Sequence, residues 1–175
     1  MRQMKKVALT SIALAFALTL TSCGAGPNAE TRKTSRVTDG AEAVINTDGA
    51  DIRVSNLLLV ATEDGSAVVV GHIVNRSEEA DEILGITVGG VGAAITGLTK
   101  LETNKPIHFE GELANAKAVF AGVNPVAGTN VDITIGFARA GLVTVRALIR
   151  DKRDLYANVT SGAKLSTPEA TPAAK

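Results

Sequence analysis

Two neighbouring segments near the C-terminal end of the chain carry an apolar side chain at every second position, and this pattern restricts the possible folds most strongly. Residues 143–149 repeat the alternation of residues 131–137 after the turn Ala140-Gly141. A period of two places alternate side chains on opposite faces of a β-strand. The two segments therefore predict a β-hairpin with one buried face, which carries Val131, Ile133, Ile135, Phe137, Val143, Val145, Ala147 and Ile149.

Short apolar segments separated by turn residues fill the chain upstream of this hairpin. We expect strands over residues 37–45, 51–61, 66–75, 82–88, 93–98 and 106–113, whereas residues 114–123 allow either a helical turn or a strand. In residues 51–61, the alternation places Ile52, Val54, Leu58 and Val60 on one face. Residues 66–75 are apolar on both faces, which is typical of a central strand.

The amino-acid composition also favours a β-protein. Beyond residue 22 there is no methionine and no tryptophan, so the core depends on Val, Ile, Leu and Ala. β-Branched residues in short runs are typical of strands. We therefore predict an all-β fold with a single domain over residues 37–160, an antiparallel Greek-key β-sandwich of the cupredoxin-like or immunoglobulin-like kind.

The N-terminal end has the three parts of a secretory signal. Basic residues lie at positions 2, 5 and 6, an apolar run covers residues 7–20, and small residues follow. At 14 residues, that run is shorter than the ~20 residues of a membrane-spanning helix. Its end, Leu20-Thr21-Ser22-Cys23, resembles the lipobox of bacterial lipoproteins. The resemblance implies cleavage after Ser22, which makes residues 1–22 a signal peptide, and diacylglycerol on the sulfur of Cys23.

Lipid on Cys23 would anchor the chain, because each buried CH₂ contributes about 0.8 kcal/mol and two or three acyl chains hold a protein on a bilayer. The polar residues 23–36 are then a flexible tether, and the small, polar residues 161–175 are predicted to be a disordered tail. We expect an exported protein on the outer face of the cytoplasmic membrane, within the cell envelope. An ordinary cleaved signal followed by an unmodified cysteine is the alternative.

Several runs of the domain resemble the small LpqE-type envelope lipoproteins of actinobacteria. These runs are Ile73-Val74-Asn75 and residues 81–86, 128–137 and 140–145. The LpqE type is similar in turn to the PCu(A)C periplasmic copper chaperones, whose fold is a cupredoxin-like β-sandwich. The resemblance implies this fold for nearly all of the domain, and it rests mostly on turn and core positions.

The resemblance does not extend to the copper ligands of those chaperones. The family holds Cu(I) with paired His and Met side chains, because soft thioethers select the soft ion. One such pair is expected at residues 117–120, which are Lys, Ala, Val and Phe here. We therefore assign no cofactor and no inherited ligand to this chain.

Two histidines and one acidic loop are the remaining candidates for a site. His72 and His108 are the only histidines, and two imidazoles fall short of a tetrahedral metal site. His72 is expected to be a buried core residue and His108 to lie on a polar face, with no sign that the two converge. Glu78, Glu79, Asp81 and Glu82 lack the spacing of a calcium-binding loop and predict a solvated acidic segment.

Charge and motif content exclude two functional classes. Loss of residues 1–22 leaves 15 basic against 18 acidic side chains, which gives no basic footprint for nucleic acid. The only cysteine is the proposed anchor, and no GxSxG motif is present, so we predict no enzymatic activity.

The sequence as a whole indicates a membrane-anchored binding or accessory module. Its predicted contacts are membrane lipid through Cys23 and an unidentified envelope protein, lipid or polysaccharide. A copper-handling protein with a diverged metal site is the alternative.

Overall fold

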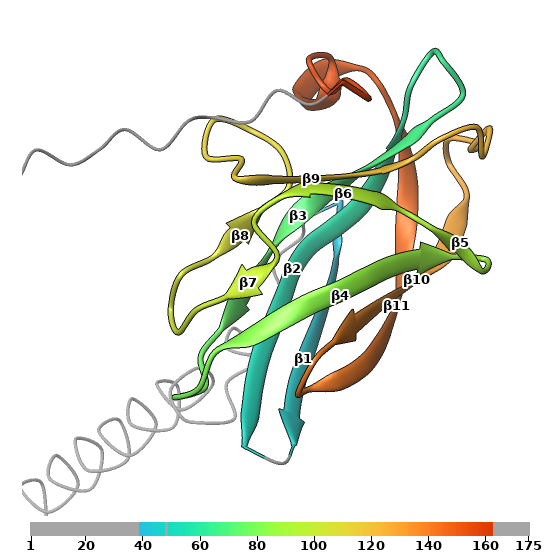
Figure 1. Cartoon of the computed structure of the whole chain (residues 1–175). Coiled ribbons are helices and arrows are strands. Elements are labelled where there is room, and N and C mark those ends of the chain that lie inside the picture. Colours follow the sequence, from blue (N-terminus) through green and yellow to red (C-terminus); the bar gives the residue numbers. More distant parts are fainter. Residues whose placement is uncertain (1–38, 48, 163–175) are drawn as a thin grey trace, which may run out of the picture. The chain divides into compact units, whose positions relative to one another are not determined.

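The computed structural model describes residues 39–47 and 49–162, which form an all-β domain (Figure 1). The predicted signal peptide, Cys23, the tether and the tail from residue 163 lie outside the described residues. Within the described ranges, no helix has the length and apolarity that crossing a membrane requires. The elements are β1 (Ala41–Thr47), β2 (Ala50–Ala61), β3 (Ala67–Asn75), β4 (Asp81–Val88), β5 (Val91–Gly92), β6 (Ala94–Gly97), β7 (Lys100–Leu101), β8 (Ile107–His108), β9 (Ala116–Phe120), β10 (Asn130–Phe137), β11 (Gly141–Asp151) and the 3₁₀ turn η1 (Asp154–Tyr156).

The strands follow one another in the order β5-β4-β10-β11-β2-β3-β9-β6, so the last long strand pairs with an early one. β10 and β11 form the predicted hairpin, and β2 pairs with β3 as a second hairpin. The pairing is antiparallel except between β11 and β2, where Ile149, Arg150 and Asp151 run parallel to Leu59, Val60 and Ala61. The prediction of an all-β single domain is confirmed, and its strand pairing is antiparallel for the most part.

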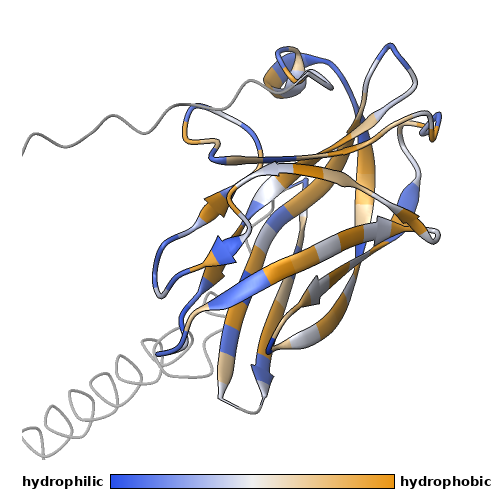
Figure 2. Ribbon diagram, viewed as in Figure 1, coloured by the Kyte–Doolittle hydropathy of each residue, from blue (hydrophilic) through white to orange (hydrophobic). Residues whose placement is uncertain are grey.

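The main core is built from β-branched and other aliphatic side chains of β2, β3, β4, β10 and β11, with three phenylalanines. Phe109 and Phe120 are fully buried, and Phe137 is nearly so. Figure 2 shows the apolar residues concentrated on the strands and hydrophilic residues in connections such as that between β7 and β8. A second, smaller cluster lies on the other face of β2 and β3, where Tyr156 and Val159 cover Leu58, Val60, Val68 and Val70.

A β-bulge in β2 changes which face its apolar side chains occupy. Asn56 has a left-handed backbone with φ of 53°, and the pairing with β3 shifts between Ser55 and Leu58. The shift reverses the alternation. Leu57 and Leu59 therefore share the main core with Ile52 and Val54, whereas Leu58 and Val60 join the smaller cluster. The expectation that Ile52, Val54, Leu58 and Val60 share one face is wrong for this reason.

The segment between β7 and β10 also departs from the pattern. Only Ile107–His108 of the expected strand at residues 106–113 joins a ladder, and Leu113 at the end of that range is 71% exposed. Asn115 closes this segment back on itself, since its side chain accepts from the amide of His108 (2.8 Å) and donates to the carbonyl of Pro106 (3.0 Å). The ambiguous residues 114–123 supply a strand, β9.

Candidate functional site

The structure brings the two histidines together. His72 of β3 and His108 of β8 are direct partners in an antiparallel pair, and their ring centroids are 5.5 Å apart with the planes inclined by 34°. Both side chains are half-buried. The expectations that His72 is a core residue and that the two histidines do not converge are therefore wrong. The sequence gives no register for a two-residue strand, so it could not predict the pairing.

Alternation along the two strands explains why both imidazoles leave the core on the same side. Ile73 pairs with Ile107, and both side chains are buried in the main core. Because successive side chains of a strand point to opposite faces, His72 and His108 lie on the outer face of this sheet. The amide of Phe109 donates to the carbonyl of Gly71 (3.0 Å) and extends the contact between β3 and the segment after β8.

Burial affects the ionisation of one histidine of the pair. Burial, and secondly the charge of His72, lower the pKa of His108 below its usual value. Among residues 39–47 and 49–162, no side chain or backbone group hydrogen-bonds to either ring. In the same residues, no third His, Cys, Asp or Glu joins the pair as a potential metal ligand.

The segment expected to carry the family's ligand pair contains a buried ion pair instead. The Lys117 ammonium lies 2.6 Å from a carboxylate oxygen of Glu110, and the two side chains are 4% and 16% exposed. An ammonium at this position repels a metal cation. Sequence reasoning missed this contact, because Glu110 lies on the segment that folds back and not on a regular strand.

One carboxylate of the acidic loop has a structural position. Asp81 is buried, and it accepts hydrogen bonds from the backbone amides of Glu82 (2.7 Å), Arg139 (2.9 Å) and Ala140 (2.9 Å). Its neighbours Glu78 and Glu79 are exposed. The prediction of a solvated acidic segment thus fails for Asp81, whose carboxylate ties β4 to the turn between β10 and β11.

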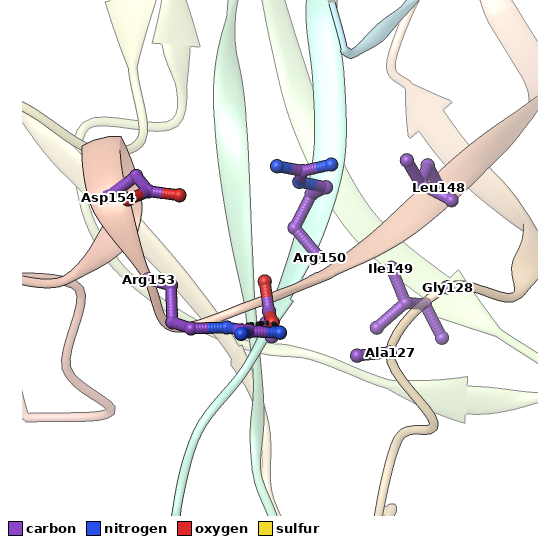
Figure 3. A pocket seen from close by; sticks show the side chains of 8 residues that line it. Ala127, Gly128, Leu148, Ile149, Arg150, Arg153 and Asp154 are labelled. Carbon is purple, nitrogen blue, oxygen red and sulfur yellow. Dashed lines mark hydrogen bonds and ion pairs between the residues drawn. The ribbon is translucent and has the colours of Figure 1, made fainter.

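A groove of about 470 Å³ lies beside the end of β11 (Figure 3). Its charges are arranged in pairs: Arg153 contacts Asp151, and Arg150 lies 3.7 Å from Asp39 and 5.9 Å from the ring centre of Tyr156. Each arginine thus has a carboxylate nearby, although the buried Nε atom of Arg150 has no hydrogen-bond partner in the described part of the chain. The residues lining the groove are Ala127, Gly128, Leu148, Ile149, Arg150, Asp151, Arg153 and Asp154.

The outer face of β4, β10 and β11 carries two uncharged rows of residues. The first row places Thr134 between Thr87 and Thr144, and the hydroxyls of Thr134 and Thr144 are 2.9 Å apart. The second row places Gly136 between Gly85 and Leu142. Leu142 is 78% exposed and Leu84, beside Gly85, is 68% exposed. We call these seven residues the β4–β10–β11 face.

Comparisons with known proteins identify the fold. The apo PCuAC domain from PmoF1 superposes with a TM-score of 0.52 at 22% identity, over 63% of this chain and 98% of that domain. The chain has a PCuAC-like fold. The copper-bound PCuAC domain from PmoF2 gives the same TM-score at 16% identity, over 63% of this chain and 97% of that domain. No protein-family model matches the sequence, and a search of curated proteins finds no match.

The PCuAC-like scaffold of this chain therefore carries different groups at its candidate positions. Lys117 and Glu110 form an ion pair in the segment where ligands were expected, and the histidines pair between β3 and β8. At these identities the similarity describes the fold, and the side chains of this chain determine its chemistry.

Proposed function

We propose that this chain is an exported envelope lipoprotein of the LpqE type, in which Cys23 carries the lipid and the PCuAC-like domain is a non-catalytic binding module for another envelope protein. The pattern Leu20-Thr21-Ser22-Cys23 supports the anchor. The Lys117–Glu110 ion pair argues against a cation at the position of the family's ligands. Residues 1–22 would be lost, and the domain would work at the outer face of the membrane.

The single observation that carries the binding role is the β4–β10–β11 face. Two exposed leucines flank strand glycines that bear no side chain, and a row of threonines continues the surface without a charge. The centres of protein–protein interfaces are depleted in charged residues, and exposed apolar patches on a soluble domain mark interaction sites. The lack of charge in these two rows favours a protein partner over an anionic lipid headgroup or a charged polysaccharide.

Site-specific photo-crosslinking from this face tests the proposal. A photoreactive side chain in place of Thr144 in the membrane-anchored protein should capture a protein partner in cells. Capture should fall strongly when Leu84→Lys and Leu142→Lys are added, because both put a charge into the interface. Leu113→Lys is the matched control, since Leu113 is 71% exposed on a different segment and its replacement should leave capture unchanged.

Two results would contradict this proposal. Crosslinks only to lipid or polysaccharide would show that the partner is not a protein. Capture that survives Leu84→Lys and Leu142→Lys would show that the face is not the contact surface.

A further inference from the structure

The pairing of the two histidines is separate from the β4–β10–β11 face and has no part in the binding role proposed above. The rings lie on the outer face of β3 and β8, 5.5 Å apart and half-buried. They are the only imidazoles of the 175-residue chain. The ring nitrogens of half-buried histidines stay available to an outside ligand unless a protein group hydrogen-bonds to them. In the described part of the chain, these nitrogens have no such partner.

We propose that His72 and His108 form a two-imidazole site for a divalent transition-metal ion, with Cu²⁺ preferred to Zn²⁺ and the other coordination positions open to water or an outside ligand.

The strand pairing preorganises the two ligands. β3 lies between β2 and β8, and the main chain of His108 is fixed by Asn115 on one side and by the ladder with β3 on the other. Metal–nitrogen bonds of about 2 Å require the two ligating nitrogens to lie within about 4 Å of one another. Rings with centroids 5.5 Å apart can satisfy this requirement by rotation about the side-chain bonds.

The donor set determines which ion fits. Imidazole suits Cu and Zn, and divalent affinity follows the Irving–Williams order, in which Cu²⁺ exceeds Zn²⁺. A neutral imidazole binds a metal ion without first losing a proton. Because no third His, Cys, Asp or Glu of residues 39–47 and 49–162 joins the pair, the bound ion would keep exchangeable positions.

Metal titration of the full-length chain in detergent tests the site. The protein carries Cys23→Ser, so that no thiol competes, and it has no polyhistidine tag. Calorimetric titration with Cu²⁺ alone should give one ion per chain, and Zn²⁺ alone should bind at least about tenfold more weakly. Electron spin-echo spectroscopy of the Cu²⁺ complex should show coupling to imidazole nitrogen, which only His72 and His108 can supply.

Ring-preserving variants separate ligation from packing. His72→Phe and His108→Phe keep an aromatic ring in the contact but remove the donor, and each should weaken Cu²⁺ binding at least about tenfold. Glu112→Gln is the matched control, because Glu112 is an exposed acid near β8, and it should leave the affinity unchanged.

The proposal is overturned if the Cys23→Ser protein with both histidines shows no imidazole coupling, or if both Phe variants bind Cu²⁺ as tightly as that protein does. The first result decides the question even if a Phe variant fails to fold. Either result would leave the proposed binding role of the β4–β10–β11 face intact, because the two surfaces share no residue.

Discussion

Asp81 shows how much of this fold depends on single polar side chains. Its carboxylate accepts three backbone amides from two segments that are far apart in the sequence, residue 82 and residues 139–140. An exposed loop of acids would tolerate substitution, but a buried acceptor cannot be lost without leaving donors unpaired. The acidic loop therefore contains one residue of structural importance among neighbours that face water.

Asp81→Ala should lower the free energy of unfolding by about 1–3 kcal/mol, because it leaves three part-buried backbone amides without their acceptor. Urea unfolding followed by circular dichroism measures the change. The control is Glu78→Ala in the same loop, which should change stability by no more than about 0.5 kcal/mol since Glu78 is exposed. Equal effects of the two substitutions would contradict the assigned role of Asp81.

His108 makes stability depend on pH in a defined direction. The pKa of His108 in the folded chain lies below the ordinary 6.5, so the unfolded chain binds this proton more readily. Stability is therefore fully retained above about pH 6.5 and decreases as the pH falls through 6.5 towards the folded-state pKa.

Urea unfolding between pH 7.5 and pH 5 should reveal this contribution. We expect stability to fall less steeply on acidification in His108→Phe than in the unsubstituted protein, because the variant lacks the titrating ring. Identical pH profiles would show that His108 has the same pKa in both states. Carboxylates titrate in both proteins and cancel in the comparison.

At the scale of elements, the strands could be predicted and their irregularities could not. Alternation is a local property, so β10 and β11 follow directly from the order of apolar residues. The bulge in β2 depends on a left-handed residue, Asn56, which an otherwise regular pattern conceals. The histidine pair depends on the register between β3 and a two-residue strand nearly 40 positions later, which no local pattern determines.

The bulge in β2 restricts which residue can occupy position 71 of the neighbouring strand β3. Its φ is +139°, and a Cβ there would lie 2.9 Å from the carbonyl oxygen of Asn56 and 3.1 Å from Cα of Leu57. These are backbone atoms of the bulge, so they cannot move aside cheaply. Glycine at this position allows β2 and β3 to stay paired through the irregularity.

Gly71→Ala should destabilise the domain by about 1–3 kcal/mol, because it combines an unfavourable backbone conformation with a close contact. The matched control is Gly85→Ala in β4, since a Cβ at Gly85 meets no atom within 4 Å. The control should be neutral or slightly stabilising. Thermal unfolding compares the two variants, and equal melting temperatures would contradict the restriction described for Gly71.

At the scale of the whole molecule, the described domain and the proposed anchor are joined by a chain segment that only the sequence characterises. The domain supplies a core and two candidate surfaces, and Cys23 would determine where those surfaces work. The anchor therefore needs a test that is independent of the fold.

Cys23→Ser should move the protein from the membrane fraction to the soluble fraction, because a diacylglyceryl thioether cannot form on oxygen. Two or three acyl chains give stable attachment, so the shift should be nearly complete. Fractionation followed by immunoblotting measures it, and mass spectrometry of the unsubstituted protein should find acyl mass on a peptide that begins at Cys23. An unmodified N-terminus at a different residue would contradict the lipoprotein proposal.

The parallel pairing of β2 with β11 has a consequence for the order in which the chain is synthesised and folds. Leu59 and its partner Ile149 are about 90 residues apart, so these two strands can pair only when almost the whole domain has been synthesised. Until then the second half of β2 presents an open backbone edge, and contacts between distant segments form slowly. A polypeptide that cannot complete its fold before its last strand is made stays unfolded for longer, and this order of events would suit the export proposed above.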